Sequence, residues 1–155
     1  MARRFVIQGN YSSVSAAQDC LRITAPTSGV IRLIEAHVTQ DEDETSEQLP
    51  FALYRATDNG TGTAANVANL EFQTQDSLGA ITGFSASYNL SGATTKSPAA
   101  PLVREAVNIL SGFHFVPVPE ARPLASAGGR LVIRLEQAPT NSLSLSVYAV
   151  VEIEG

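Results

Sequence analysis

Residues 128–155, GGRLVIRLEQAPTNSLSLSVYAVVEIEG, alternate apolar and polar side chains over most of their length. Apolar residues take every second position from 131 to 135 and again from 143 to 153. Side chains along a strand point alternately to opposite faces, whereas a helix needs apolar positions three and four apart. Because Pro139 and Asn141 favour a turn between the two runs, we predict an antiparallel hairpin with one buried face.

Similar alternation recurs upstream and predicts further strands. It appears in residues 20–25, 49–57 and 106–115, each bounded by residues that favour turns. Residues 30–40 differ in one respect, because Ile31 and Leu33 fall on the face opposite Val30, Ile34, Ala36 and Val38. This pattern predicts a strand that is covered on both sides at its start.

Together these runs give about seven or eight strands separated by turn-rich loops, with little helix. They predict an all-β fold, an antiparallel β-sandwich, with the jelly roll as the leading version. We expect residues 1–12 to form an N-terminal arm or edge strand and 13–155 a single sandwich domain, with an irregular excursion at about 58–103. The only candidate helices, each of about two turns, are 11–19 and 62–70.

Composition narrows the function classes. Charged residues make up 16% of the chain, against roughly 25% in an average domain, which suggests that a partner covers part of the surface. A net charge of −5 disfavours nucleic acid as a partner, and no apolar run approaches the roughly 20 residues of a membrane span. No secretory signal is recognisable at the start. Cys20 is the only cysteine, so we expect no internal disulfide and synthesis in a reducing cytosol.

Reactive residues are few. His37 and His114 are the only histidines, and both fall in predicted strands, with His114 facing solvent or an interface. A nucleophile–base pair of a histidine with Cys20 is conceivable, but no glycine-rich nucleophile turn surrounds the cysteine. The acidic run at 41–47 has no glycine where a calcium loop needs its sharp turn. A solvated turn is favoured there, and contact with a basic patch on a partner stays open. We therefore predict no enzyme, no catalytic residue, no cofactor and no metal site.

Two stretches carry a resemblance to a known group of proteins. They are VSAAQDCLRITAPTSGVIRLIEAHVTQ (14–40) and FVPVPEARPLASAGGRLVIRLEQAPTNSLSLSVYAVVEIEG (115–155). They resemble small β-sandwich virion proteins of tailed bacteriophages, and most of all capsid decoration, or cement, proteins. The likeness rests on AAQD before a strand, P-E-x-RP before GGRL, and the paired last strands. It implies a jelly-roll or related sandwich that is made in the host bacterial cytoplasm and assembles as a homotrimer. It further implies a place on the capsid exterior, bound to the major capsid protein, without an active site.

A cement protein binds many equivalent places by buried area and shape, and extended arms or small-residue loops suit such contacts. We therefore expect contacts with the shell or with neighbouring subunits from residues 2–8 and 83–103. The individual candidates are Arg3, Arg4, Phe5, Phe84, Tyr88, Leu90 and Lys96. The alternatives are a tail- or fibre-associated sandwich that binds a receptor or glycan, a cellular ligand-binding sandwich, and an enzyme. The absence of tryptophan makes the glycan signal weak.

Overall fold

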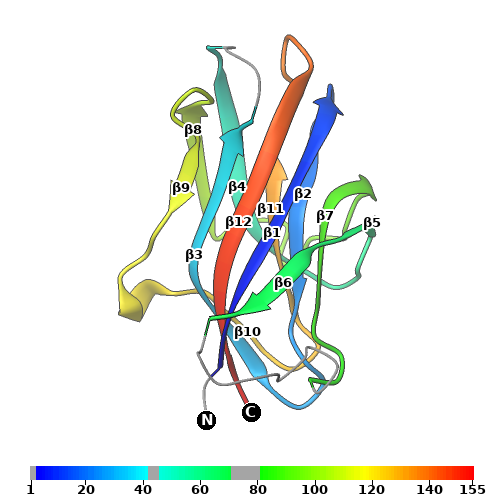
Figure 1. Cartoon of the computed structure of the whole chain (residues 1–155), viewed down its shortest axis with the longest axis vertical. Helices are drawn as coiled ribbons and strands as arrows, with labels where there is room; N and C mark the ends of the chain where they lie inside the picture. The colour runs from blue at the N-terminus through cyan, green and yellow to red at the C-terminus, as the bar shows by residue number, and fades with distance from the viewer. Residues whose placement is uncertain (1–2, 42–45, 71–80) are drawn as a thin grey trace.

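The computed structural model describes residues 3–41, 46–70 and 81–155, which form two antiparallel β-sheets packed face to face (Figure 1). The strands are β1 (Arg3–Val14), β2 (Gln18–Thr24), β3 (Val30–Gln40), β4 (Gln48–Ala56), β5 (Thr61–Ala64), β6 (Asn66–Asn69), β7 (Ser85–Gly92), β8 (Val103–Asn108), β9 (Phe113–Phe115), β10 (Leu124–Ala125), β11 (Arg130–Leu135) and β12 (Leu143–Glu154). A single-turn 3-10 helix, η2 (Pro119–Ala121), precedes β10. The predicted all-β antiparallel sandwich is confirmed. The two candidate helices are wrong, because both stretches are mainly strand.

Strand order identifies the sandwich as a jelly roll. Sheet A runs β10-β3-β12-β1-β6, with β9 on the same edge of β3 as β10, and sheet B runs β5-β7-β2-β11-β4-β8. The first strand pairs with the last, β2 with β11, β3 with β9, and β4 with β8. The chain is thus a long double-stranded ribbon rolled into two sheets, which is the construction of a jelly roll.

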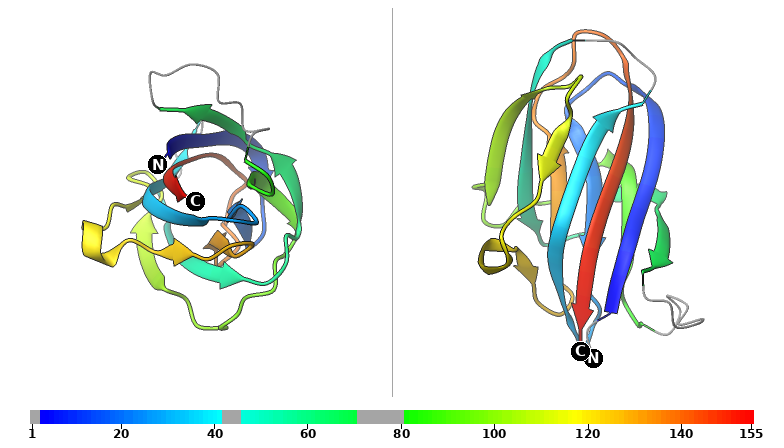
Figure 2. Two further views of the ribbon diagram at one scale, coloured as in Figure 1. Left: turned by 90° about the horizontal axis from the view of Figure 1, so that it is seen from below. Right: turned by 60° about the vertical axis from the view of Figure 1, so that its left-hand side comes forward.

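The closing stretch corrects the predicted hairpin. β11 lies in sheet B between β2 and β4, whereas β12 lies in sheet A between β3 and β1 (Figures 1 and 2). The two strands therefore face each other across the core instead of pairing. Alternation predicts which side chains of a strand point inward. The same side chains point inward in a hairpin and in two strands of facing sheets, so alternation does not distinguish the two arrangements.

The N-terminal strand is part of the sandwich and not a free arm. Among the described residues, those of β1 from Gly9 onward pair with β12 alone, so this part of β1 is an edge strand. Residues 5–8 pair with β12 on one side and with β6 on the other. The part of the excursion at 58–103 that the structure describes, 58–70 and 81–103, contains more strand than expected, and residues 71–80 lie outside the described residues. It adds β5 and β7 to sheet B and β6 to sheet A, so the chain passes between the sheets near Ala65.

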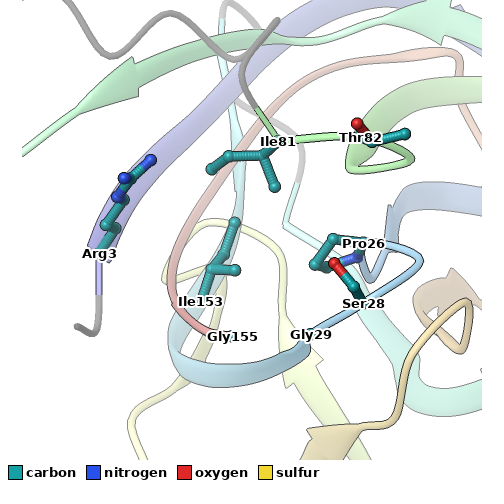
Figure 3. Close-up of a pocket in the computed structure, with 8 residues that line it drawn as sticks. All are labelled: Arg3, Pro26, Ser28, Gly29, Ile81, Thr82, Ile153 and Gly155. Carbon is teal, nitrogen blue, oxygen red and sulfur yellow. The ribbon is translucent and has the colours of Figure 1, made fainter.

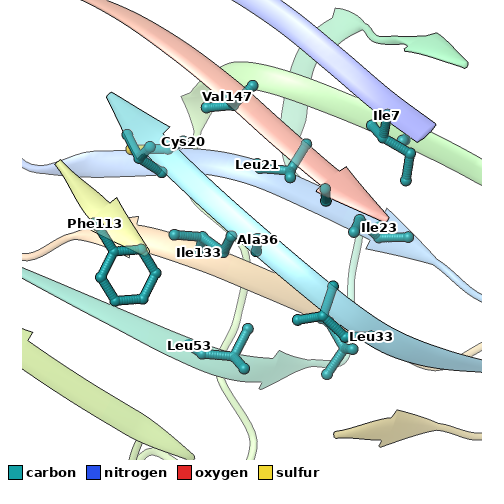
Figure 4. Close-up of a cluster of buried hydrophobic side chains, with 14 of the residues drawn as sticks. Ile7, Cys20, Leu21, Ile23, Leu33, Ala36, Leu53, Phe113, Ile133 and Val147 are labelled. Carbon is teal, nitrogen blue, oxygen red and sulfur yellow. The ribbon is translucent and has the colours of Figure 1, made fainter. Parts of the chain in front are cut away.

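A β-bulge explains the double-sided pattern of β3. Its register against β12 shifts so that Val150 pairs with Glu35 and Val151 with Leu33, leaving Ile34 as an extra residue. An inserted residue reverses the parity of all positions beyond it. Leu33 and Ala36 consequently both point into the core, although three positions separate them (Figure 4).

The run at 106–115, read as one strand, is two strands in different sheets. β8 ends in sheet B, and after a turn at 109–112 β9 pairs with β3 in sheet A. Gly112 allows this turn because its φ is +79°, in the left-handed region that favours glycine. Ile109 and Phe113 close the core at this end, and the Phe113 ring stacks on Phe51 with centroids 5.5 Å apart.

The core lies between the sheets and is built from the inward side chains of both (Figure 4). Leu21, Ile23 and Ile133 come from sheet B, and Ile7 and Val147 from sheet A. All five are at most 2% exposed, which confirms the predicted inward faces of β2, β11 and β12; for β1 no inward face was predicted.

Candidate functional site: an apolar groove at the open edge of the sandwich

One side of the sandwich carries a hollow of about 480 Å³ between the edges of the two sheets. It lies where β8 forms the edge of sheet B and β9 and β10 lie on the edge of sheet A. The segment 116–123 projects outward here, as the yellow loop that stands away from both sheets in Figure 2 shows. We call this hollow the edge groove. Its lining is Arg55, Leu102, Val103, Phe115, Pro117, Glu120, Ala121, Arg122, Pro123 and Leu124.

Prolines create the projection. β9 and β10 pair with the same edge of β3, and the segment between them carries Pro117, Pro119 and Pro123. Proline has no N–H to donate to a β-ladder, so the chain leaves the sheet after Phe115. A 3-10 turn closes the projection, with Ala121 N donating to the Val118 carbonyl at 2.9 Å.

The edge groove is apolar and open to solvent. Leu124 in its lining is 44% exposed. Val116 and Val118 do not line the hollow, but they lie on the projecting segment beside it and are 64% and 63% exposed. These are high values for aliphatic side chains so close together, and exposed apolar patches of this kind mark interaction sites. The charged residues Arg55, Glu120 and Arg122 also line it, which gives the apolar-centre and polar-rim composition common in protein interfaces.

One hydrogen bond ties the two sheets together at the edge groove. Arg55 on β4 donates from Nη2 to the Leu124 carbonyl at 3.2 Å. The Nε of Arg122 is buried, and no hydrogen-bond partner for it lies among the described residues. A buried donor of this kind stabilises a complex if a partner supplies an acceptor.

Sequence reasoning missed this surface. The signal was the repeat VPVP at 116–119, in which prolines alternate with valines. Prolines at alternate positions prevent regular pairing within a sheet, so the valines between them are not held in a buried strand.

Three of the predicted contact residues are core residues. Phe5 is fully buried, and its ring packs on Phe84 with centroids 5.8 Å apart. Phe84 and Leu90 are 7% and 3% exposed. Phe5 and Phe84 belong to the core between the sheets, whereas Leu90 on β7 is buried beside Gly60 and Gly62 at the neighbouring strand β5. The predicted surface role of these three side chains therefore does not fit their position.

Lys96 also points into the protein. Its Nζ lies 2.6 Å and 2.7 Å from the two carboxylate oxygens of Asp19, whose side chain is fully buried. Thr94 donates to the same carboxylate from its backbone N and its Oγ1, each at 2.7 Å, and Arg134 donates at 3.0 Å. Burial alone would raise the pKa of Asp19, but these hydrogen bonds together hold the pKa below its ordinary value. The network attaches the loop after β7 to β2 and β11.

The remaining predicted contact residues stay at or near the surface. Arg4 is exposed and donates from Nε to Glu152 at 3.1 Å. Tyr88 is half-buried, and its ring lies 5.9 Å from that of Tyr11. Arg3 lines a second, smaller hollow near the two chain ends, which Figure 3 shows.

That second hollow measures about 220 Å³. Ile81 and Ile153 lie in its middle, with Pro26 and Ser28 beyond them, while the guanidinium of Arg3 points away from this group (Figure 3). The residues that line it bring no reactive groups together, and we assign it no role.

The conceivable cysteine–histidine pair is wrong. Cys20 lies in the core, where burial raises the pKa of its thiol to about 11. His37 and His114 lie on the outer face of sheet A, on the far side of that sheet from the core. They face each other across paired strands, with His114 exposed to solvent as predicted.

The acidic run lies largely outside the described residues, which omit 42–45. Of its two described members, Asp41 is exposed, and Glu47 accepts hydrogen bonds from the backbone N and the Oγ1 of Thr140. Glu47 therefore joins β4 to the β11–β12 connection.

In comparisons with known proteins, no family model and no curated protein match the chain. The described residues contain no helix with the length and hydrophobicity that crossing a membrane requires.

Proposed function

We propose that this protein is a structural virion protein that binds the outer surface of a tailed-phage capsid and stabilises the shell. Its partners are the major capsid protein and further copies of itself, in a homotrimer. The role is adhesion by buried area and shape, without turnover and without a cofactor.

The observation that carries this proposal is the edge groove with its projecting valines. An adhesive protein needs an apolar surface that remains accessible in the folded monomer. Val116 and Val118 provide that surface, each more than 60% exposed. Each directly precedes a proline, which restricts its backbone to extended conformations.

The interior supports the same role. A shell cement must not deform under load, and side-chain hydrogen bonds fix irregular loops of this sandwich. The Asp19–Lys96 network holds the loop after β7, and Glu47 holds the connection before β12. We accordingly centre the proposed contact surface on the edge groove, which keeps Leu102 and Val103 of the predicted range 83–103 and leaves out residues 2–8.

Assembly as a trimer would raise the overall affinity for the shell above that of one weak contact. Three copies that bind three equivalent places on a shell gain effective concentration for the second and third contacts. Light scattering of the purified protein tests this part, since a monomer at micromolar concentration would contradict the homotrimer.

The proposed function is tested by binding to particles. Purified protein should co-sediment with capsids of the phage that encodes it, and Val116→Asp/Val118→Asp should abolish co-sedimentation by placing charge on the apolar surface. Leu110→Asp is the matched control, because Leu110 is 56% exposed in the β8–β9 turn, outside both the projecting segment 116–123 and the lining of the edge groove. Equal binding by all three proteins would overturn the assignment of the surface.

Copy number separates this function from the alternative of a tail- or fibre-associated sandwich involved in attachment. A decoration protein should give a gel band comparable with that of the major capsid protein, and a tail-tip protein a far fainter one. A faint band, or binding confined to tails, would replace the proposed function with the alternative.

A further inference from the structure

His37 on β3 and His114 on β9 lie directly opposite each other on the outer face of sheet A. Their Nδ1 atoms are 2.6 Å apart. On its other side His37 is paired with Tyr148 of β12, with ring centroids 5.6 Å apart. The two imidazoles therefore meet at an edge of the sheet that solvent reaches.

The outer nitrogens of both rings already have acceptors. His37 Nε2 lies 3.3 Å from Oε2 of Glu35, and His114 Nε2 lies 2.6 Å from the carbonyl oxygen of Ser111. A carboxylate and a carbonyl can only accept, so each Nε2 carries the proton. In a neutral imidazole with Nε2–H, the Nδ1 atom is an acceptor.

Two acceptor lone pairs thus face each other at 2.6 Å. They repel unless an electron-pair acceptor lies between them, which is either a proton or a metal cation. Imidazole nitrogen is a preferred ligand of Zn²⁺, Cu²⁺ and Ni²⁺. A Zn–N bond of about 2.0–2.1 Å in tetrahedral geometry needs nitrogens about 3.3 Å apart. The rings would separate by roughly 0.7 Å, and only one strand, the three-residue β9, has to move.

We propose that His37 and His114 bind a divalent transition-metal ion such as Zn²⁺ through their Nδ1 atoms. Glu35 and the Ser111 carbonyl act as orienting groups, because metal-bound histidines characteristically donate their other N–H to a carboxylate or carbonyl. The described part of the chain has no group of three His, Cys, Asp or Glu side chains arranged for a metal. The pair supplies two ligands, and water or a donor from another molecule completes the coordination.

A bound ion would fasten β9 to β3. β9 leads directly into the projecting segment that forms one wall of the edge groove. The site is independent of the proposed function, because it needs only the two strands that carry it.

Isothermal titration of ZnCl₂ into untagged protein at pH 7.5 tests the proposal. We expect saturable binding of one ion per chain, which His114→Gln and His37→Gln each abolish. Glu35→Gln should weaken binding about 10-fold or more, as loss of an orienting partner does. Glu105→Gln, an exposed carboxylate on β8, is the matched control and should bind like the unchanged protein.

Circular dichroism of each variant verifies the fold, and the imidazole resonances of the unchanged protein in NMR give a second measurement. They should shift on zinc addition and stay unchanged on magnesium addition. Three results would overturn the proposal: no saturable binding, binding that survives His114→Gln, or binding lost on neutralising the acidic run 41–47 instead. The first would mean that a shared proton alone relieves the repulsion.

Discussion

Two irregular segments of this protein, 93–101 and 116–123, both contain prolines but have opposite surroundings. The first is rich in small residues, whereas the second alternates prolines with valines at its start. The first is attached to the sandwich by Lys96 and Thr94, whose donors converge on a buried carboxylate. The second projects and exposes Val116 and Val118. The comparison teaches that an irregular sequence alone does not mark a contact surface. What decides is whether the side chains of the segment are bound inside the protein or exposed to solvent.

Removing the carboxylate of Asp19 should have the largest effect, because it would detach segment 93–101 and remove its difference from segment 116–123. Asp19→Ala leaves Lys96 and Arg134 without their shared acceptor, and breaking a buried ionic group costs about 3–5 kcal/mol. We expect the free energy of unfolding in urea at pH 7 to fall by that amount and protease to cut within 93–101. Glu105→Gln should change stability by less than about 0.5 kcal/mol. A fully stable Asp19→Ala protein would show that the network does not hold the loop.

The same carboxylate predicts a pH dependence. Hydrogen bonds hold the folded-state pKa of Asp19 below the value of about 3.9 expected in the unfolded chain. Its stabilising contribution is therefore present above about pH 4 and is lost as the pH falls through the lower folded-state pKa. Urea denaturation between pH 7 and pH 2 should show the stability gap between the unchanged protein and Asp19→Ala narrowing in acid. A gap that stays constant would contradict the assignment.

Lys96→Met should cost less, about 2 kcal/mol, because Arg134 and Thr94 still bind the carboxylate. The combination with Asp19→Ala should cost clearly less than the sum of the two single changes, since both act on one network. Urea denaturation of the four proteins measures this coupling, and strict additivity would mean that Lys96 and Asp19 act separately.

Arg55→Met should cost about 1 kcal/mol, the value of an ordinary hydrogen bond. It removes the donor to the Leu124 carbonyl at the edge groove while keeping an apolar stem of similar length. Amide hydrogen exchange should speed up in β10 and remain unchanged in 93–101. Faster exchange in both segments would show that they are not independent.

Val116→Ser/Val118→Ser should have the smallest effect on stability, within about 0.5 kcal/mol, because both side chains are exposed in the monomer. The same double change should reduce self-association in light scattering. A loss of several kcal/mol in urea denaturation would mean that the projecting segment belongs to the core of the fold and is not a free surface.

The sequence predicted the strands and their buried faces well, because period-two alternation is a local property. It did not predict pairing. The inward faces of β11 and β12 would be the same in a hairpin and in facing sheets, and only the partners β2, β4, β1 and β3 decide between them. The sequence also misassigned which side chains of β3 share a face. The extra residue Ile34 is recognised only from the pairing of β3 with β12.

The candidate surface was harder to predict for a related reason. Phe5, Phe84 and Leu90 are apolar residues in stretches with weak alternation, and such residues are compatible with both an arm and a core. Lys96 carries a charge and therefore looks like a surface residue. Its carboxylate partner Asp19 is 77 positions away, and no local pattern contains that information.

Pairing of the first strand with the last has a consequence for biosynthesis. β1 and β3 have no contact with each other in sheet A until β12 fills the space between them, and β2 and β4 likewise need β11 in sheet B. While the ribosome is still making those two strands, four earlier ones present open edges that nothing yet occupies. Full pairing of both sheets therefore waits until β12 has been made, and a chaperone that shields strand edges in the meantime would raise the yield.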